Sequence, residues 1–143
     1  MRYSNAVLDR VRDPKFVGAL PKDERNVGTG EAGTLDEGSM ARIQIRMDGD
    51  GVRIADAVFK VFGCSAAIAS ASFVAERLQG ASLSQARSLE PMVVAAELQL
   101  PIERAHVAAM AVRAAHAAIE DWERKQSQTG RLRAADSDDR DFR

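Results

Sequence analysis

The stretch VFKVFGCSAAIASAS, residues 58–72, contains the transition that decides the fold. An apolar, strand-like run ends at Gly63, which has no Cβ and therefore permits a sharp change of direction. A run of small residues follows. Ser65 is placed to cap the helix that they begin, because its hydroxyl can accept a hydrogen bond from a first-turn amide. The pattern predicts a strand, a tight turn and a helix over residues 65–79.

Cys64, the only cysteine in the chain, lies within this turn. At the start of a helix it would meet the positive end of the helix dipole, which favours the thiolate. The thiolate is the form that acts as a nucleophile and as a metal ligand. A cysteine can also be a small buried hydrophobic residue without chemistry, and this stretch alone leaves both interpretations open.

Composition narrows the class of protein. The 143 residues suit one domain with a hydrophobic core, and the net charge of −1 gives no overall attraction to nucleic acid or to an anionic membrane. Aromatic residues make up only 5%, too few for a base-stacking surface. No apolar run reaches membrane-spanning length, and no signal-peptide pattern opens the chain. We expect a cytoplasmic protein without nucleic-acid or membrane partners.

Strand patterns precede the turn. Residues 41–47 alternate between apolar and polar, which predicts a half-buried strand, and the Asp-Gly-Asp-Gly sequence at 48–51 predicts a hairpin turn. Alternation resumes at Val52 and changes parity near Asp56, which indicates a bulge or a break. We therefore expect three short antiparallel strands between residues 41 and 62.

Further upstream, residues 3–11 have a helical period with Ser4 as the cap. Residues 14–38 are rich in glycine and polar residues, and they predict a long, irregular and mobile connection. The Gly-x-Gly at Gly28 and Gly30 follows no predicted strand and opens no helix. Flexible turns are therefore favoured there over a phosphate-binding loop.

The second half of the chain is helical in pattern. Gly80 suits the end of the first helix, Ser82 begins a capping box, and Pro91 suits the first turn of another short helix. A long helix is predicted over 102–126. The fold class is therefore α+β, a three-stranded antiparallel sheet with helices on one face. We expect one domain over residues 1–126 and a disordered tail over 127–143.

Few side chains offer chemistry. Besides Cys64, the candidates are His106 near a helix start and the carboxylates Asp36 and Glu37 in the glycine-rich segment. A sulfur, an imidazole and a carboxylate from these places can meet at one end of the domain. No nucleophile-elbow motif and no paired acid and base occur, so we do not expect an enzyme.

Several motifs match one family in order and spacing between Tyr3 and about Lys125. They include NVGTG at 26–30, FK at 59–60, GC at 63–64, AIAS at 67–70, LP at 100–101 and His106. On these motifs the chain resembles the scaffold proteins of iron–sulfur cluster assembly, IscU and the N-terminal domain of NifU. The resemblance implies an α+β fold with a site at one end, where the family assembles a [2Fe–2S] cluster or binds zinc.

The resemblance also implies a ligand set of three cysteines, an aspartate and a histidine. Cys64 and His106 match the second cysteine and the histidine. Glu37 stands at the first cysteine position, Ser39 at the aspartate and Val107 at the third cysteine. The family's Leu-Pro-Pro-Val-Lys chaperone-binding segment keeps only its first two residues, at 100–101.

Three interpretations stay open. A reduced set of Glu37, Cys64 and His106, with Asp36 as a further candidate, resembles an open zinc or iron site. A homodimer could also supply two copies of Cys64 and His106 to one shared [2Fe–2S] cluster. The second interpretation is a cluster-incompetent docking or regulatory module that binds a cysteine desulfurase, another cluster-assembly protein or an intact scaffold. The third is a structural role with Cys64 buried.

Overall fold

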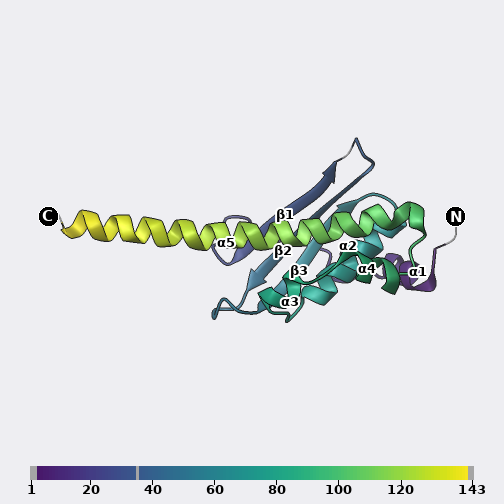
Figure 1. Ribbon diagram of the computed structural model, residues 1–143, viewed down its shortest axis with the longest axis horizontal. Helices are drawn as coiled ribbons and strands as arrows, with labels where there is room; N and C mark the ends of the chain where they lie inside the picture. Colours follow the sequence, from purple (N-terminus) through teal and green to yellow (C-terminus); the bar gives the residue numbers. More distant parts are fainter. Residues whose placement is uncertain (1–2, 35, 142–143) are drawn as a thin grey trace.

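A three-stranded antiparallel sheet in the order β1-β2-β3 forms the centre of the molecule (Figure 1). The computed structural model describes residues 3–34 and 36–141, with the burial of side chains described as far as residue 128. The elements are α1 (Asn5–Arg12), β1 (Val27–Thr34), β2 (Ser39–Met47), β3 (Ile54–Phe62), α2 (Ser65–Leu78), α3 (Leu83–Arg87), α4 (Pro91–Glu97), the 3₁₀ turn η1 (Ile102–Arg104) and α5 (Ala105–Asp141). The predicted α+β class is confirmed.

The central strand β2 has the predicted alternation. Ala41, Ile43 and Ile45 are fully buried on the face that the helices cover. The expected change of parity is also present, because Arg46 pairs with Asp56 whereas the next residue pairs with Ile54. One residue of β3 is therefore unpaired, as in a bulge. The separate strand expected at 52–54 does not exist, since Ile54 already belongs to β3.

The prediction of an irregular connection over residues 14–38 is wrong for residues 27–34, which form β1. Its glycines fit α5 rather than a turn. A Cβ at Gly28 would collide with the carbonyl oxygen of Ala118, and one at Gly30 would collide with that of Ala114. A long helix can rest directly on this strand only because those Cβ atoms are missing.

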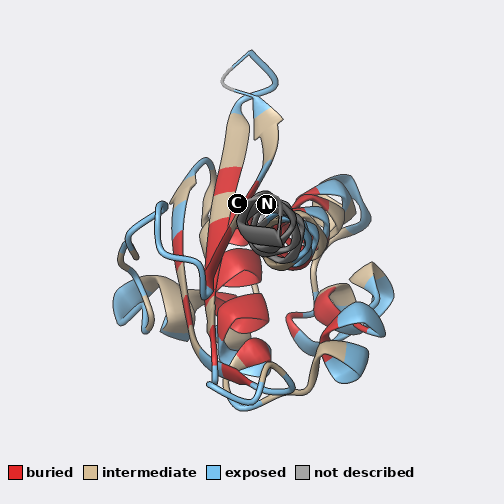
Figure 2. Cartoon of the chain, turned by 90° about the vertical axis from the view of Figure 1, so that its left-hand side faces the viewer, coloured by how far each residue is buried: buried red, intermediate tan, exposed pale blue. Residues whose placement is uncertain are grey.

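All the helical packing is on one face of the sheet. Helix α5 lies along β1 and β2, and α2 lies along β3 and against α5. Figure 2 shows the buried parts of the strands turned towards these helices. Small residues allow the close approach of α2: Ala66, Ala67, Ala69, Ser70 and Ala71 are all buried.

The segment before β1 covers part of the opposite face. Alternation along β2 turns Gln44 to that face, where the side chain is 1% exposed. The Gln44 amide accepts a bond from the Leu20 nitrogen at 2.9 Å and donates to the Leu20 carbonyl at 2.8 Å. Val17 forms a parallel bridge with Phe59 on the free edge of β3. This end of the predicted loop is therefore tied to the sheet.

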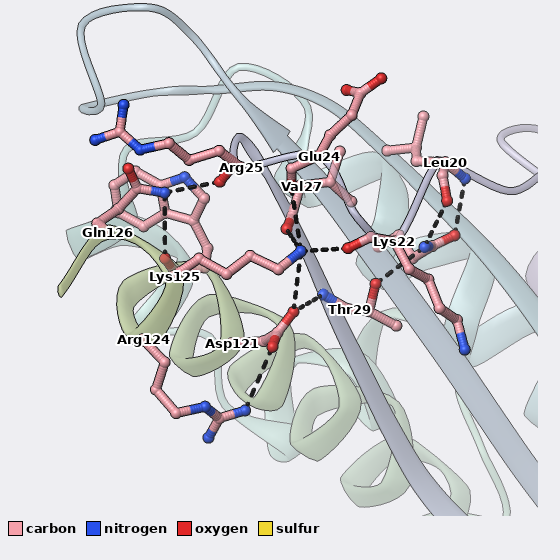
Figure 3. A network of polar contacts seen from close by, with 12 residues as sticks. Leu20, Lys22, Glu24, Arg25, Val27, Thr29, Asp121, Arg124, Lys125 and Gln126 are labelled. Atoms are coloured by element: carbon pink, nitrogen blue, oxygen red, sulfur yellow. Dashed lines mark hydrogen bonds and ion pairs between the residues drawn. The ribbon is translucent and has the colours of Figure 1, made fainter. Parts of the chain in front are cut away.

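Two side chains of α5 hold the approach to β1 in place (Figure 3). The Lys125 ammonium donates to the carbonyl oxygens of Lys22, Glu24 and Val27, at 2.5, 3.1 and 2.7 Å. Gln126 donates to the Arg25 carbonyl at 2.7 Å. These bonds satisfy backbone acceptors that the turn into β1 leaves without a strand partner.

Helix α5 runs beyond the predicted boundary. The sequence predicts a disordered tail from Ser127, but the helix continues to Asp141 and extends past the sheet (Figure 1). No proline follows Pro101, and extending an existing helix is far easier than nucleating one. Residues 142–143 of the predicted tail lie outside the described residues. Within the described chain, no helix is both long and apolar enough to cross a bilayer.

Candidate functional site around Cys64

The turn from β3 into α2 places Cys64 at the helix start. Cys64 is the N-cap residue, with φ −75° and ψ 173°, and Ser65 is the first residue of the helix. The predicted Ser65 cap is therefore wrong by one position, and no side chain caps α2. Gly63, at φ +154°, makes the turn. The side chain of Cys64 is half-buried, so it is neither sealed in the core nor fully in solvent.

A positive charge lies close to this thiol. The Arg104 guanidinium, in η1, donates from Nε to the Tyr3 hydroxyl oxygen at 3.3 Å. The pKa of Arg104 is raised, first by that hydrogen bond and then by the electrostatic influence of Tyr3 and Cys64. Neither Tyr3 nor Arg104 stood out as a site residue in the sequence. Only the fold, which joins residues 101 positions apart, places them at Cys64.

The hairpin between β1 and β2 brings a hydroxyl, rather than a carboxylate, to the turn. A Cβ at Gly63 would lie 2.7 Å from Ser39 Oγ, so Ser39 packs directly against the residue before Cys64. Asp36 and Glu37 are exposed in the loop that joins the two strands. Figure 1 shows this loop standing clear of the helices.

The histidine candidate lies on a neighbouring element. His106 is the second residue of α5 and is exposed, whereas Val107 is fully buried in the core. No group of three His, Cys, Asp or Glu side chains in the described part of the chain is arranged to hold a metal ion. The structure therefore does not assemble Glu37 or Asp36 with Cys64 and His106 as a ready-made ligand set.

The donor chemistry argues in the same direction. Iron–sulfur clusters are generally held by four thiolates, with histidines replacing two of them in Rieske-type centres. One chain supplies a single thiol. Its Val107 has no donor atom and is enclosed by hydrocarbon. The residues present in one chain do not fit a cluster.

The fold and the thiol at a strand-to-helix turn define a class of small α+β scaffold domains, and solved structures share this architecture. The N-terminal part of a NifU-like protein from Brucella abortus superposes with a TM-score of 0.63 at 20% identity, covering 85% of this chain and 94% of that one. A proposed assembly scaffold from Fervidobacterium islandicum gives a TM-score of 0.57 at 17% identity, covering 81% and 95%. At these identities the likeness concerns the fold.

Sequence comparison gives the family. The family model described as NifU-like N terminal domain matches residues 2–129, and the chain belongs to that family. It is 41% identical over 126 residues to the iron–sulfur cluster assembly scaffold protein IscU of Haemophilus influenzae, covering 88% of this chain and 99% of the relative. The IscU of Escherichia coli is 38% identical, with 88% and 98% covered.

Proposed function

We propose that this chain serves iron–sulfur cluster assembly as a docking protein that accepts sulfur on Cys64 and holds no cluster within one chain. The relatives named as cluster assembly scaffolds support the pathway. The loss of donor atoms supports the change of role, since only one of the three cysteine positions of the family is still a cysteine.

The observation that carries the proposal is the setting of Cys64. It is half-buried at the start of α2 and lies beside the Arg104 guanidinium. Helix N-termini and neighbouring cations are the features that make a cysteine thiol reactive in proteins. An inert cysteine needs neither of them.

The chemical step is a thiol exchange. The Cys64 thiolate attacks the terminal sulfur of a persulfide on a cysteine desulfurase, and the sulfur–sulfur bond of the enzyme breaks. A new persulfide forms on Cys64, and the thiolate of the desulfurase leaves. One sulfur atom moves between two cysteines, with no external oxidant or reductant. The partner is therefore a protein that presents a persulfide at an accessible surface.

A metal site is the competing function. Iron or zinc on Glu37, Cys64 and His106 requires the exposed loop carboxylate and the exposed imidazole to move to the thiol. A shared cluster would need a second chain. Carboxylate, imidazole and thiolate donors suit zinc and ferrous iron chemically, but the geometry described above does not support this arrangement.

One experiment separates the two functions. The full chain and its Cys64→Ser variant are incubated anaerobically with a cysteine desulfurase and radiolabelled cysteine, and protein-bound sulfur and metal are then measured. We expect label released by reductant on the natural protein, none on the variant and no stoichiometric metal on either. Stoichiometric metal lost in Cys64→Ser, together with no bound sulfur, would overturn the proposal.

A further inference from the structure

One part of the sheet face opposite the helices is left uncovered. The segment over Gln44 protects the inner part of this face, and its Gly18 lies against Val58. Closer to the β1–β2 loop there is a groove of about 250 Å³, here called the outer patch. Its lining residues are Glu31, Met40, Arg42, Lys60, Val61 and Phe62.

The outer patch has an apolar row. Met40 of β2 and Phe62 of β3 are directly paired across the strands. Phe62 is 58% exposed, an unusual loss for an aromatic side chain in a sheet. Phe62 also lies two residues before Cys64, so the patch adjoins the candidate site.

The next row inwards is basic. Arg42 pairs directly with Lys60, and like charges in this position destabilise a sheet. Neither side chain makes an ion pair or a side-chain hydrogen bond among the described residues, and Glu31 instead approaches Lys22 at 4.0 Å. This row is therefore a site where carboxylates from outside the chain would remove an unfavourable pairing.

The carboxylates with the matching spacing are in the chain itself. Asp36 and Glu37, both exposed, occupy the loop at the end of the same hairpin. Along the hairpin the order is acidic loop, apolar row, basic row. A twofold axis reverses that order, so the acidic loop of one copy meets the basic row of the other and the apolar rows meet at the axis.

We propose that the outer patch is a homodimer interface, in which Asp36 and Glu37 of each chain face Arg42 and Lys60 of its partner. At about 3.3 Å per residue, Glu37 lies roughly 10 Å from Met40 on one side and Arg42 roughly 7 Å on the other. An axis near Met40 thus brings the opposite charges within side-chain reach. This inference does not rest on the proposed function.

The dimer has a consequence for the thiol. Because Cys64 follows Phe62 so closely, a twofold axis through the apolar row brings the Cys64 turns of both copies to the same interface. A single chain offers one thiol there, and the dimer offers two. The interface is therefore also a place where the two cysteines can be linked chemically.

Charge reversal tests the interface on the full chain. Sedimentation equilibrium at low salt is measured for the natural protein, for Arg42→Glu/Lys60→Glu, for Asp36→Lys/Glu37→Lys and for all four changes together. We expect each double variant to weaken dimerisation by at least about 10-fold, and the combined variant to recover it to within about 3-fold, because the charge pairs are restored in reverse. All four positions are on the surface, and circular dichroism checks that each variant is folded.

The matched control is Arg12→Glu/Lys15→Glu, the same charge change on exposed residues away from the hairpin. It leaves dimerisation unchanged, whereas Phe62→Ser weakens it. A short bismaleimide cross-links Cys64 to Cys64 in the natural protein and much less in the double variants. A natural protein that is monomeric at several hundred micromolar, or a dimer equally strong in both double variants, overturns the proposal. So does a monomer whose outer patch captures only another, acidic protein.

Discussion

Arg104 donates a hydrogen bond from Nε to the Tyr3 hydroxyl at 3.3 Å, and the same guanidinium acts electrostatically on Cys64. The first helical region and the start of α5 thus meet at the thiol. This contact joins the two ends of the folded domain and supplies the only cation near Cys64 that acts on the pKa pattern described above.

The first prediction concerns this cation. We expect Arg104→Gln to slow alkylation of Cys64 by iodoacetamide about 2- to 5-fold at neutral pH and low salt, as expected for the loss of one partly exposed charge. Stopped-time mass spectrometry measures the rate. The control Arg113→Gln, an exposed position in α5, leaves it unchanged. Equal rates in the two variants would remove Arg104 from the site.

The second prediction concerns the contact between β1 and α5. Gly30→Ala places a Cβ against the backbone carbonyl of Ala114, which cannot rotate away. We expect a loss of about 3 kcal/mol in the free energy of unfolding, at the upper end for overpacking. Urea denaturation measures it. Gly49→Ala, where nothing lies within 4 Å, changes it by less than about 0.5 kcal/mol. A small effect at Gly30 would contradict the close packing.

The third prediction concerns the Lys125 anchor. Lys125→Met keeps most of the side-chain volume and removes the donor to the carbonyls of Lys22, Glu24 and Val27. We expect a loss of about 1–3 kcal/mol, because buried acceptors lose their partner. Amide exchange should become faster in residues 20–27 while β3 is unchanged. Arg124→Met, which removes only a surface ion pair, serves as the control; exchange equal to that of Arg124→Met would count against the anchor.

The fourth prediction restores donors. In Glu37→Cys/Ser39→Asp/Val107→Cys the positions that match the family's ligands regain its residue types. We expect anaerobic reconstitution with iron and sulfide to give a cluster absorbance in this variant and none in the natural protein, since one thiol per chain is too few. Cys64→Ser in the restored background serves as the control and abolishes the absorbance. Equal absorbance in the natural protein would show that the reduced set is sufficient.

The alternation of β2 and the parity change in β3 could be predicted because side chains on one strand face report directly on burial. Strand β1 could not, since its glycines reflect the path of α5 rather than any local preference. The end of α5 was missed because low hydrophobicity was taken as disorder, although nothing in the sequence stops the helix.

The site divides in the same way. The position of Cys64 at a helix start followed from Gly63 and the small residues after it, with the cap misplaced by one residue. The convergence of Glu37, Cys64 and His106 was a prediction about long-range contacts, which no local pattern specifies. The hairpin instead brings Ser39 to the turn, and Arg104 was found only in three dimensions.

The most direct measurement is native mass spectrometry of the anaerobically purified full chain after incubation with a cysteine desulfurase and cysteine. Our account predicts the mass of one added sulfur atom per chain, located on Cys64 by fragmentation, with no metal retained. A chain that gains no sulfur and carries iron or zinc that depends on Cys64 would contradict it.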